Sequence, residues 1–556
     1  MSKKKQYLDP NAPLLYPDHP LPVTRRDFLR QGLISGAGMT IGGSVMNLFA
    51  NPREAQATLS ADLIAPNGCA IGGSGANPVP VMCFDLAGGA NIAGSNALVY
   101  TETGGSMSTA GYSKLGLPGD MVPGGVEPTA SATGTSNGDF TDSTLGSKTH
   151  SDSAILRGIL ARLTDPAARG RVNGSVIAAR SDNDTGNNPH NPMYGIAKAG
   201  MNVAGNPDPV SIAGIVTLIG SRNSESGGNS MAPASMIDAA LRPTKVDRAS
   251  DVTGLVDTGN LTGILSDRDD VVAVMESISR ISKQKLGKVD TGLDVTNNQI
   301  VKDLLDCGYL KAADIADRFA GRSINPVEDG RLVDGATGDP FTGTGIFTTD
   351  EVGPTATSND RREFEKTASV VKMLVDGHAG VGTVTMGGYD YHTGTRGPGE
   401  TRDFRAGQCI GAALQYAAHR GAPIMIYVFS DGSVASNGAI TDDGPGRGKP
   451  NWTGDNSSTA CSWMLYFDPN ATPEAGVNRP NNVIREQIGW FRSDASVDTS
   501  SSAVANNVNL LAEAVVLNYL ALQGREGEYG GLFGGLGTNV SALAPYIAFP
   551  QLQDPP

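Results

Sequence analysis

Cysteine is scarce in this 556-residue sequence, which holds five, none of them in a C-x-x-C pair. An odd and widely spaced set argues against a disulfide framework and against a structural zinc site built from cysteines. Cys69 and Cys83 are the one pair close enough in sequence to suggest a bridge in an oxidising compartment. Cys83, Cys409 and Cys461 lie inside apolar runs, so we expect them to be small buried hydrophobic residues.

Lysine and arginine are also outnumbered by acidic residues. The chain has 43 Lys and Arg against 57 Asp and Glu, which gives a net charge of −14, and only 18% of its residues are charged. Because an acidic surface repels nucleic acid and anionic lipid, both are excluded as expected partners. Glycine is abundant instead, with 72 residues, and the apolar runs suffice for a core. This composition favours an exported globular protein with hydrogen-bonding loops.

No apolar segment is long and unbroken enough to predict a stable membrane span. The N-terminal 57 residues instead have the pattern of a twin-arginine signal peptide. The motif Thr24-Arg25-Arg26-Asp27-Phe28-Leu29-Arg30 precedes a glycine-rich apolar segment, and Ala55-Gln56-Ala57 supplies a cleavage site. The sequence therefore predicts export in the folded state, to the periplasm or beyond the cell.

Residues 58–556 read as a single α/β domain, because predicted strands alternate with amphipathic helices. That alternation favours a doubly wound, largely parallel sheet covered on both faces. A Gly/Ser/Thr-rich excursion occupies residues 100–150, and a mostly helical insertion occupies about 221–350. The predicted strands lie at 79–86, 172–179, 210–219, 381–386, 423–429 and 461–468, and the main predicted helices at 151–163, 267–285, 297–319, 361–376, 402–419 and 504–522.

The segment Gly387-Gly388-Tyr389-Asp390-Tyr391-His392 follows a predicted strand, and ligands in such sheets bind at the loops beyond the carboxyl ends of strands. A carboxylate and an imidazole two residues apart are candidate metal ligands or acid–base groups. Asp85 and Asp431 lie at the ends of two other predicted strands, and His190 lies in a proline-stiffened loop. Convergence of these side chains predicts a divalent-metal site. Asp residues that cap turns and a solvated loop histidine would explain the same pattern.

The order of these features resembles an exported bacterial family related to alkaline phosphatases and sulfatases, some of whose members are loosely labelled secretion-pathway proteins. Gly387-Gly388-Tyr389-Asp390-Tyr391-His392 resembles that family's Gly-Gly-Trp-Asp-x-His, and Ser430-Asp431 resembles its Ser-Glu element. The resemblance implies an alkaline-phosphatase-like α/β fold. Two positions depart from the family pattern: Asn91 replaces an Asp in the first loop, and Asp455-Asn456-Ser457 replaces Asp-His-Gly.

Two functions follow from this resemblance. A degenerate metal site in a non-catalytic or weakly catalytic protein would serve envelope or secretion-related binding, with an unidentified envelope or secretion partner. Alternatively, Asp390 and His392 would bind zinc, manganese or calcium, with Asp85, Asp431 or Asp455 completing the shell for hydrolysis of a small phosphate or sulfate ester. Ser95 is the nearest candidate nucleophile for that reaction. Because Asn91 and Asn456 remove a carboxylate and an imidazole, we favour the first.

Overall fold

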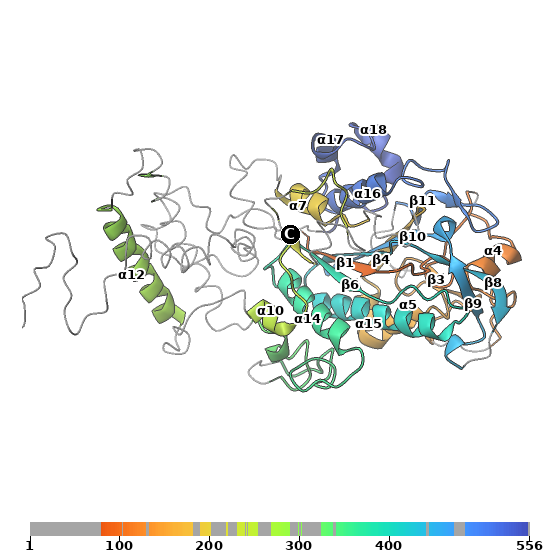
Figure 1. Cartoon of the computed structure of the whole chain (residues 1–556), viewed down its shortest axis with the longest axis horizontal. Coiled ribbons are helices and arrows are strands. Elements are labelled where there is room, and N and C mark those ends of the chain that lie inside the picture. The colour runs from red at the N-terminus through yellow and green to blue at the C-terminus, as the bar shows by residue number, and fades with distance from the viewer. Residues whose placement is uncertain are drawn as a thin grey trace, which may run out of the picture.

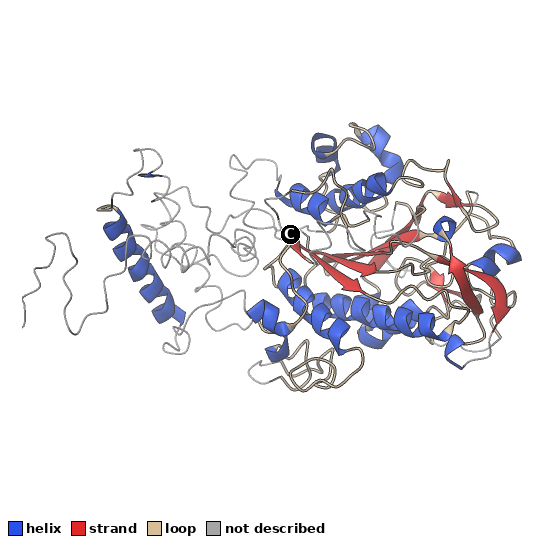
Figure 2. Cartoon of the chain, in the orientation of Figure 1, coloured by secondary structure: helices blue, strands red, loops and turns tan. Residues whose placement is uncertain are grey.

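A seven-stranded sheet runs through the structure, with helices on both faces (Figure 1, Figure 2). The strand order is β11-β4-β10-β7-β1-β6-β5, and only β10 runs against its neighbours. The prediction of an α/β chain with a largely parallel sheet is thereby confirmed. The strands are β1 (Val81–Leu86), β4 (Val172–Ala178), β5 (Leu218–Ile219), β6 (Val381–Met386), β7 (Ile424–Phe429), β10 (Cys461–Phe467) and β11 (Gln487–Ile488).

This computed structural model describes residues 79–102, 104–128, 133–181, 190–201, 218–220, 231–238, 241, 243–253, 268–289, 298–299, 302, 324–336, 341–440, 444–471 and 484–553. The predicted signal peptide, Cys69 and nearly all of the helix predicted at 297–319 therefore lie outside the described residues. The predicted insertion at 221–350 is described only in part, by α10 (Ala249–Thr253), α12 (Arg268–Leu286) and the short η1 turn (Pro326–Glu328). Figure 1 shows α12 lying apart from the sheet.

The central strands are buried on both faces, because their sequences are almost entirely apolar, with Asp85 in β1 and Ser462 in β10 as exceptions. β1 lies between β6 and β7 and pairs in parallel with each, so that Asp85 faces Thr385 on one side and Phe429 on the other. The carboxyl ends of β7, β1 and β6 consequently meet at one edge of the sheet. The loops that leave this edge carry most of the predicted site.

Each face of the sheet has its own layer of helices, as predicted. One core packs α5 (Ala154–Arg162), α14 (Arg361–Val375) and α15 (Gly397–Arg420), and the other packs α7 (Met193–Met201) and α16 (Val508–Ala521). α5 and α15 approach closely through glycine: a Cβ on Gly158 or Gly407 would lie 2.1 Å from a backbone oxygen of the partner helix. Shorter helices are α4 (Thr109–Lys114), α6 (Pro166–Arg169), α17 (Tyr529–Leu532) and α18 (Val540–Leu543).

The segment between β7 and β10, in which no strand is predicted from the sequence, contains two strands. It forms a two-stranded antiparallel ribbon of β8 (Val434–Ile440) and β9 (Pro450–Asp455), with irregular register after Ala435. The glycines and asparagines of β8 hide the strand pattern, while burial of Val434 and Trp452 holds the ribbon against the body. Two further small ribbons pair β2 (Thr141–Asp142) with β3 (Thr149–His150), and β12 (Trp490–Phe491) with β13 (Val497–Asp498).

The cysteines of the sheet and of α15 behave as predicted. Cys83, Cys409 and Cys461 are buried free thiols, and burial raises the pKa of each thiol far above its ordinary value. They therefore act as small apolar side chains in the core. Among the described residues, no helix combines the length and the apolar character needed to cross a bilayer.

His150, just before α5, makes stability sensitive to acid. It is fully buried, its Nε2 lies 2.8 Å from the oxygen of Met121, and its Nδ1 accepts a hydrogen bond from the Asp152 N–H. Burial, assisted by the charge of Lys449, lowers the pKa of His150 to about 4. Between pH 6.5 and 4 the unfolded chain therefore binds more protons than the folded chain, so folding stability falls as pH falls.

We expect His150 alone to remove about 2 kcal/mol of unfolding free energy between pH 7 and pH 4.5. Urea titrations of the wild type and of His150→Gln at several pH values would measure this. The variant should lose stability less steeply across that window. Equal slopes for the two proteins would contradict the prediction.

Candidate metal centre

The loop after β6 alternates buried and exposed side chains, and this alternation aims the predicted ligands outward. Tyr389 and Tyr391 are buried, whereas the side chains of Asp390 and His392 are 50% and 32% exposed. The Tyr389 hydroxyl donates to the backbone oxygen of Arg402 on α15, 2.8 Å away. The Tyr391 N–H donates to the Tyr389 oxygen (3.0 Å), which makes a tight turn around Asp390, and the two anchored tyrosines thereby fix the directions of the residues beside them.

A buried polar network holds Tyr391. Its hydroxyl donates to Oδ1 of Asp403 (3.1 Å) and accepts from the backbone N–H of Asn91 (3.1 Å). Oδ2 of Asp403 accepts from the Asn96 amide (2.9 Å), and Asn96 in turn accepts from Ser153 at the start of α5. Burial raises the pKa of Asp403 to about 7, although the bond from Asn96 opposes this shift. The loop after β1 (the first loop, which carries Asn91 and Asn96), the loop after β6, α5 and α15 therefore meet beneath Asp390 and His392.

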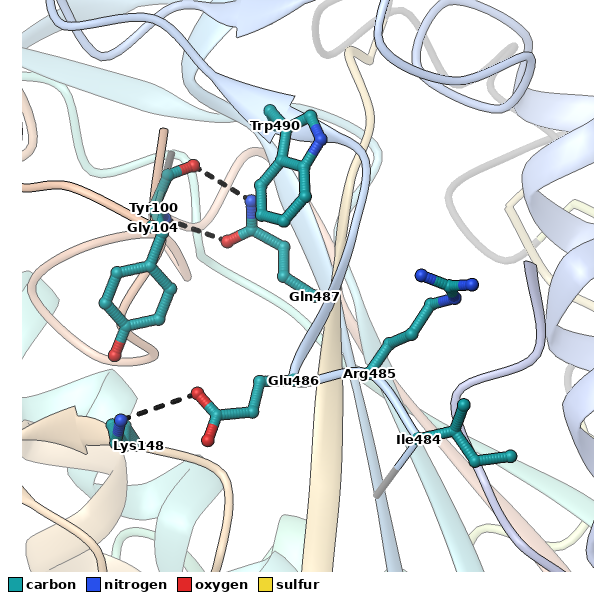
Figure 3. A pocket seen from close by; sticks show the side chains of 8 residues that line it. All are labelled: Tyr100, Gly104, Lys148, Ile484, Arg485, Glu486, Gln487 and Trp490. Atoms are coloured by element: carbon teal, nitrogen blue, oxygen red, sulfur yellow. Dashed lines mark hydrogen bonds and ion pairs between the residues drawn. The ribbon is translucent and has the colours of Figure 1, made fainter. Parts of the chain in front are cut away.

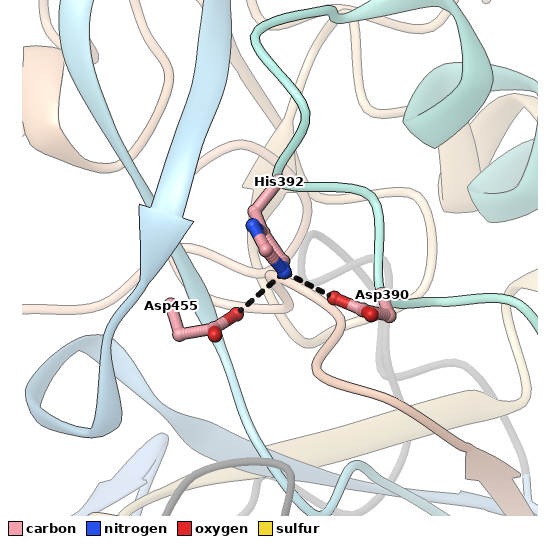
Figure 4. Close-up of side chains that lie close together, drawn as sticks. All are labelled: Asp390, His392 and Asp455. Carbon is pink, nitrogen blue, oxygen red and sulfur yellow. Dashed lines mark ion pairs between the residues drawn. The ribbon is translucent and has the colours of Figure 1, made fainter.

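The ribbon brings a third ligand-type side chain to the same point (Figure 4). Nε2 of His392 lies 2.6 Å from Oδ1 of Asp390 and 3.4 Å from Oδ1 of Asp455, at the end of β9. One ligand atom from each of the three residues lies within 4.8 Å of the others. The ribbon is held to the β6 loop by backbone hydrogen bonds from Gly394 to Trp452 and from Trp452 to Thr395.

The donor set fits zinc or manganese better than calcium. Two carboxylates and an imidazole suit zinc, whose ligands at about 2.0 Å in tetrahedral geometry lie about 3.3 Å apart. The 3.4 Å between His392 and Asp455 is close to this spacing, whereas the 2.6 Å between His392 and Asp390 is a hydrogen-bond distance. Calcium prefers six to eight oxygen ligands and does not favour imidazole. Asp390, His392 and Asp455 are the residues that would hold the ion. Their half-exposed position leaves coordination positions open to solvent.

Asp431 lies beside this group, but its side chain binds the backbone of the loop after β1. Its Oδ1 accepts a hydrogen bond from the N–H of Gly88 (2.7 Å), while the Ser430 hydroxyl accepts from Gly89 and Ala90 (3.2 and 2.8 Å). Burial raises the pKa of Asp431, and the nearby charge of Asp390 adds to this shift. Three successive amides of the first loop are thus occupied by the protein's own side chains. Gly88 also has φ +119°, and a Cβ there would lie 2.8 Å from the backbone nitrogen of Asp390.

Ser95 and Asn91 are interior residues. The Ser95 hydroxyl is 1% exposed and donates to Oδ1 of Asn91 (3.2 Å). The Asn91 amide donates to the backbone oxygen of Val434 (3.1 Å), so both ends of that side chain are engaged. The structure therefore does not bring the predicted nucleophile to the exposed ligands.

Two other predicted ligands lie elsewhere. Asp85 lies inside β1. Because every second side chain of a strand points to the same face, Asp85 points with Val81 and Cys83 to the face covered by α7 and α16. His190 stacks on Phe429 of that face, and neither of its ring nitrogens has a hydrogen-bond partner among the described residues. Burial lowers the pKa of His190 to about 4, which keeps the ring neutral. Neither residue joins the exposed group.

Asn456, at the position where the resembled family has histidine, has a structural task. Its Oδ1 accepts from the N–H (2.9 Å) and the hydroxyl (2.6 Å) of Ser458, which caps the short helix η3 (Ser457–Thr459). Its backbone N–H donates to the oxygen of Ser433, 2.9 Å away. Asn456 thus orients the chain directly after Asp455 without supplying a ligand.

We expect Tyr391→Phe to weaken zinc binding by about 10- to 100-fold, because outer groups that orient ligands have effects of this size. The variant deprives Asn91 of an acceptor and Asp403 of a donor beneath the two ligands. Tyr427→Phe is the matched control, since it removes another buried hydroxyl, bonded to Ser462 in the sheet. Calorimetric titration should show weaker binding only in the first variant; equal affinities would contradict the prediction.

Sequence reasoning identified Asp390, His392 and Asp455 but not the residues that support them. Asp403 and Asn96 carry no motif, and only the fold brings them beneath Tyr391. The geometry of the described residues therefore carries the functional argument. In comparisons with known proteins, no protein-family model, no curated protein and no solved structure matches this chain.

Proposed function

We propose that this chain is an exported protein that binds one divalent metal ion through Asp390, His392 and Asp455 and acts by binding rather than by catalysis. The grouping of three ligand atoms within 4.8 Å at the sheet edge carries this proposal. The resemblance to an exported phosphatase- and sulfatase-related family supports an envelope or secretion-related role. The unidentified partner would contact the exposed rim around the ion.

Two features favour binding over ester hydrolysis. The amides of Gly88, Gly89 and Ala90 could stabilise an oxyanion only if they were free, and Asp431 and Ser430 already occupy them. Ser95 is buried and bonded to Asn91, so it lacks the exposure that a nucleophile needs. A weak residual activity is compatible with this arrangement.

A metal-dependent ester hydrolase is the second candidate, and one observation favours it. Three protein ligands with an open side are typical of catalytic zinc sites, in which a bound ion supplies an activated water and polarises the ester. Asp390 and Asp455 are both half-exposed beside His392, so a small phosphate or sulfate ester could reach them. This alternative needs no serine nucleophile.

The test is a calorimetric titration of the chelator-treated full chain with zinc, manganese and calcium, followed by assays with p-nitrophenyl phosphate and p-nitrophenyl sulfate. One zinc or manganese ion per chain without turnover supports the binding role. Saturable turnover that Asp390→Asn abolishes supports the hydrolase. Asp120→Asn, an exposed carboxylate in another loop, is the matched control. Absence of metal binding would overturn both functions.

A further inference from the structure

A pocket of about 320 Å³ lies at the β11 edge of the sheet (Figure 3). Three segments far apart in the sequence line it: Tyr100 after the first loop, Lys148 before β3, and the stretch from Ile484 to Trp490 around β11. Four strands separate β11 from β6 in the sheet order. At about 4.8 Å per strand, β6 and β11 are about 24 Å apart, so this pocket is separate from the metal centre, whose Asp390 and His392 lie in the loop after β6.

Two aromatic side chains, Tyr100 and Trp490, form part of the wall, and their backbones are fixed. Gln487 is buried, and its amide accepts from the Tyr100 N–H and donates to the Tyr100 oxygen, both at 2.9 Å. The Trp490 N–H donates to the Ser501 hydroxyl (2.9 Å), and Phe491 donates to the Tyr100 oxygen (3.0 Å). Pre-organised aromatic walls bind a ligand at low conformational cost.

The pocket is locally cationic on an acidic protein. Two cationic side chains, Lys148 and Arg485, and one carboxylate, Glu486, line it in a chain of net charge −14, and Figure 3 shows Arg485 on the side of β11 away from Lys148 and Glu486. Lys148 lies 3.5 Å from Glu486, and its ammonium is 5.8 Å from the Tyr100 ring centroid, so this lysine is partly neutralised and covers one aromatic face. Among the described residues, the Arg485 side chain bonds only through Nε, which donates to the Ala544 oxygen (3.3 Å). Its terminal guanidinium nitrogens are available to an acidic ligand.

We propose that this pocket binds an acidic saccharide, a sugar ring that carries a carboxylate. The ring would pack on Trp490 and the exposed Ile484, its carboxylate would pair with Arg485, and its hydroxyls would exchange hydrogen bonds with Glu486 and Lys148. The volume is at the lower end of the range for small-ligand sites, about 300–1,000 Å³. This binding site is independent of the proposed metal centre.

The lining argues against two other ligand classes, a cationic ligand and a peptide that adds as a strand. A cationic ligand would meet Lys148 on the Tyr100 face and a guanidinium opposite it. A peptide adding as a strand would need a free backbone edge, but the Gln487 side chain and Phe491 already engage the Tyr100 backbone there. A saccharide uses donors, acceptors and an aromatic face together, and this lining offers all three.

Tryptophan fluorescence of the full chain tests the proposal directly. The chain has three tryptophans, of which Trp452 and Trp463 are fully buried, while Trp490 is half-buried at the pocket. Titration with digalacturonic acid should therefore give a saturable change that persists with EDTA. Maltose, a neutral disaccharide, should bind about tenfold more weakly, because it lacks the carboxylate that pairs with Arg485.

Variants separate the roles, with calorimetry as the readout where the fluorophore is removed. Trp490→Ala should weaken digalacturonate binding at least about tenfold, as for an aromatic anchor. Arg485→Gln should abolish the preference for the acidic over the neutral sugar, whereas Arg492→Gln, an exposed arginine paired with Asp498, should preserve it. No saturable binding, binding unchanged in Trp490→Ala, or equal binding of a tetraglutamate peptide would overturn the proposal.

Discussion

Replacing Asp390 and His392 by alanine together is expected to abolish zinc binding at the sheet edge. Asp455 would then be the only member of the group left, and a single half-exposed carboxylate does not hold zinc against water. Elemental analysis of the full chain purified without chelator should find about one ion per wild-type chain and only background metal in the variant.

Thermal unfolding gives the same prediction a second readout. Zinc at about 100 times its dissociation constant should stabilise the wild type by about 2.7 kcal/mol and leave the double variant unchanged. Without metal, the two proteins should differ by less than about 0.5 kcal/mol, because the replaced side chains are exposed. Asp120→Ala should retain the zinc-dependent gain. A double variant that still gains stability from zinc would place the ion elsewhere.

The sheet and its helices were predictable because their signals are local. Predominantly apolar runs predicted β1, β7 and β10, and the apolar stripe of residues 154–162 predicted α5. The ribbon β8–β9 was missed because Gly438 and Asn437 interrupt its pattern and its stability comes from tertiary packing of Trp452. Asp455 was identified only through the family resemblance, whereas in the structure the ribbon places Asp455 beside His392.

The candidate site was predictable only where loop position determines exposure. Asp390 and His392 were predicted from their loop position directly after a strand, and the structure leaves both partly exposed between two buried tyrosines. Asp85 was grouped with them as a strand-end carboxylate, but it lies within β1, and strand parity turns it to the other face. Residues that meet only through long-range packing, such as Tyr100 and Trp490, carry no shared signal in the sequence.

Lys372→Met is expected to cost about 3–5 kcal/mol of unfolding free energy, the largest stability effect that we predict. Lys372 is 6% exposed, and its Nζ lies 2.6 Å from Oδ2 of Asp329 and 2.8 Å from Oδ2 of Asp376. Burial alone would lower the pKa of Lys372, but the two carboxylates outweigh it and raise that pKa. The variant leaves these two buried negative charges facing each other with one ammonium fewer.

Removing a carboxylate along with the lysine should restore part of the loss. In Lys372→Met, Asp329→Asn the remaining acid, Asp376, keeps Arg420 at 2.9 Å and the Tyr416 hydroxyl at 3.0 Å. We expect this double variant to be more stable than Lys372→Met alone, since a buried unpaired charge costs more than a missing ion pair. Lys245→Met, at an exposed pair with Asp247, should change stability by less than about 1 kcal/mol. Urea titration of all four proteins measures these differences. A loss below about 1 kcal/mol in Lys372→Met would mean that the charges around α14 and η1 reorganise without the ammonium, and would contradict a fixed buried cluster.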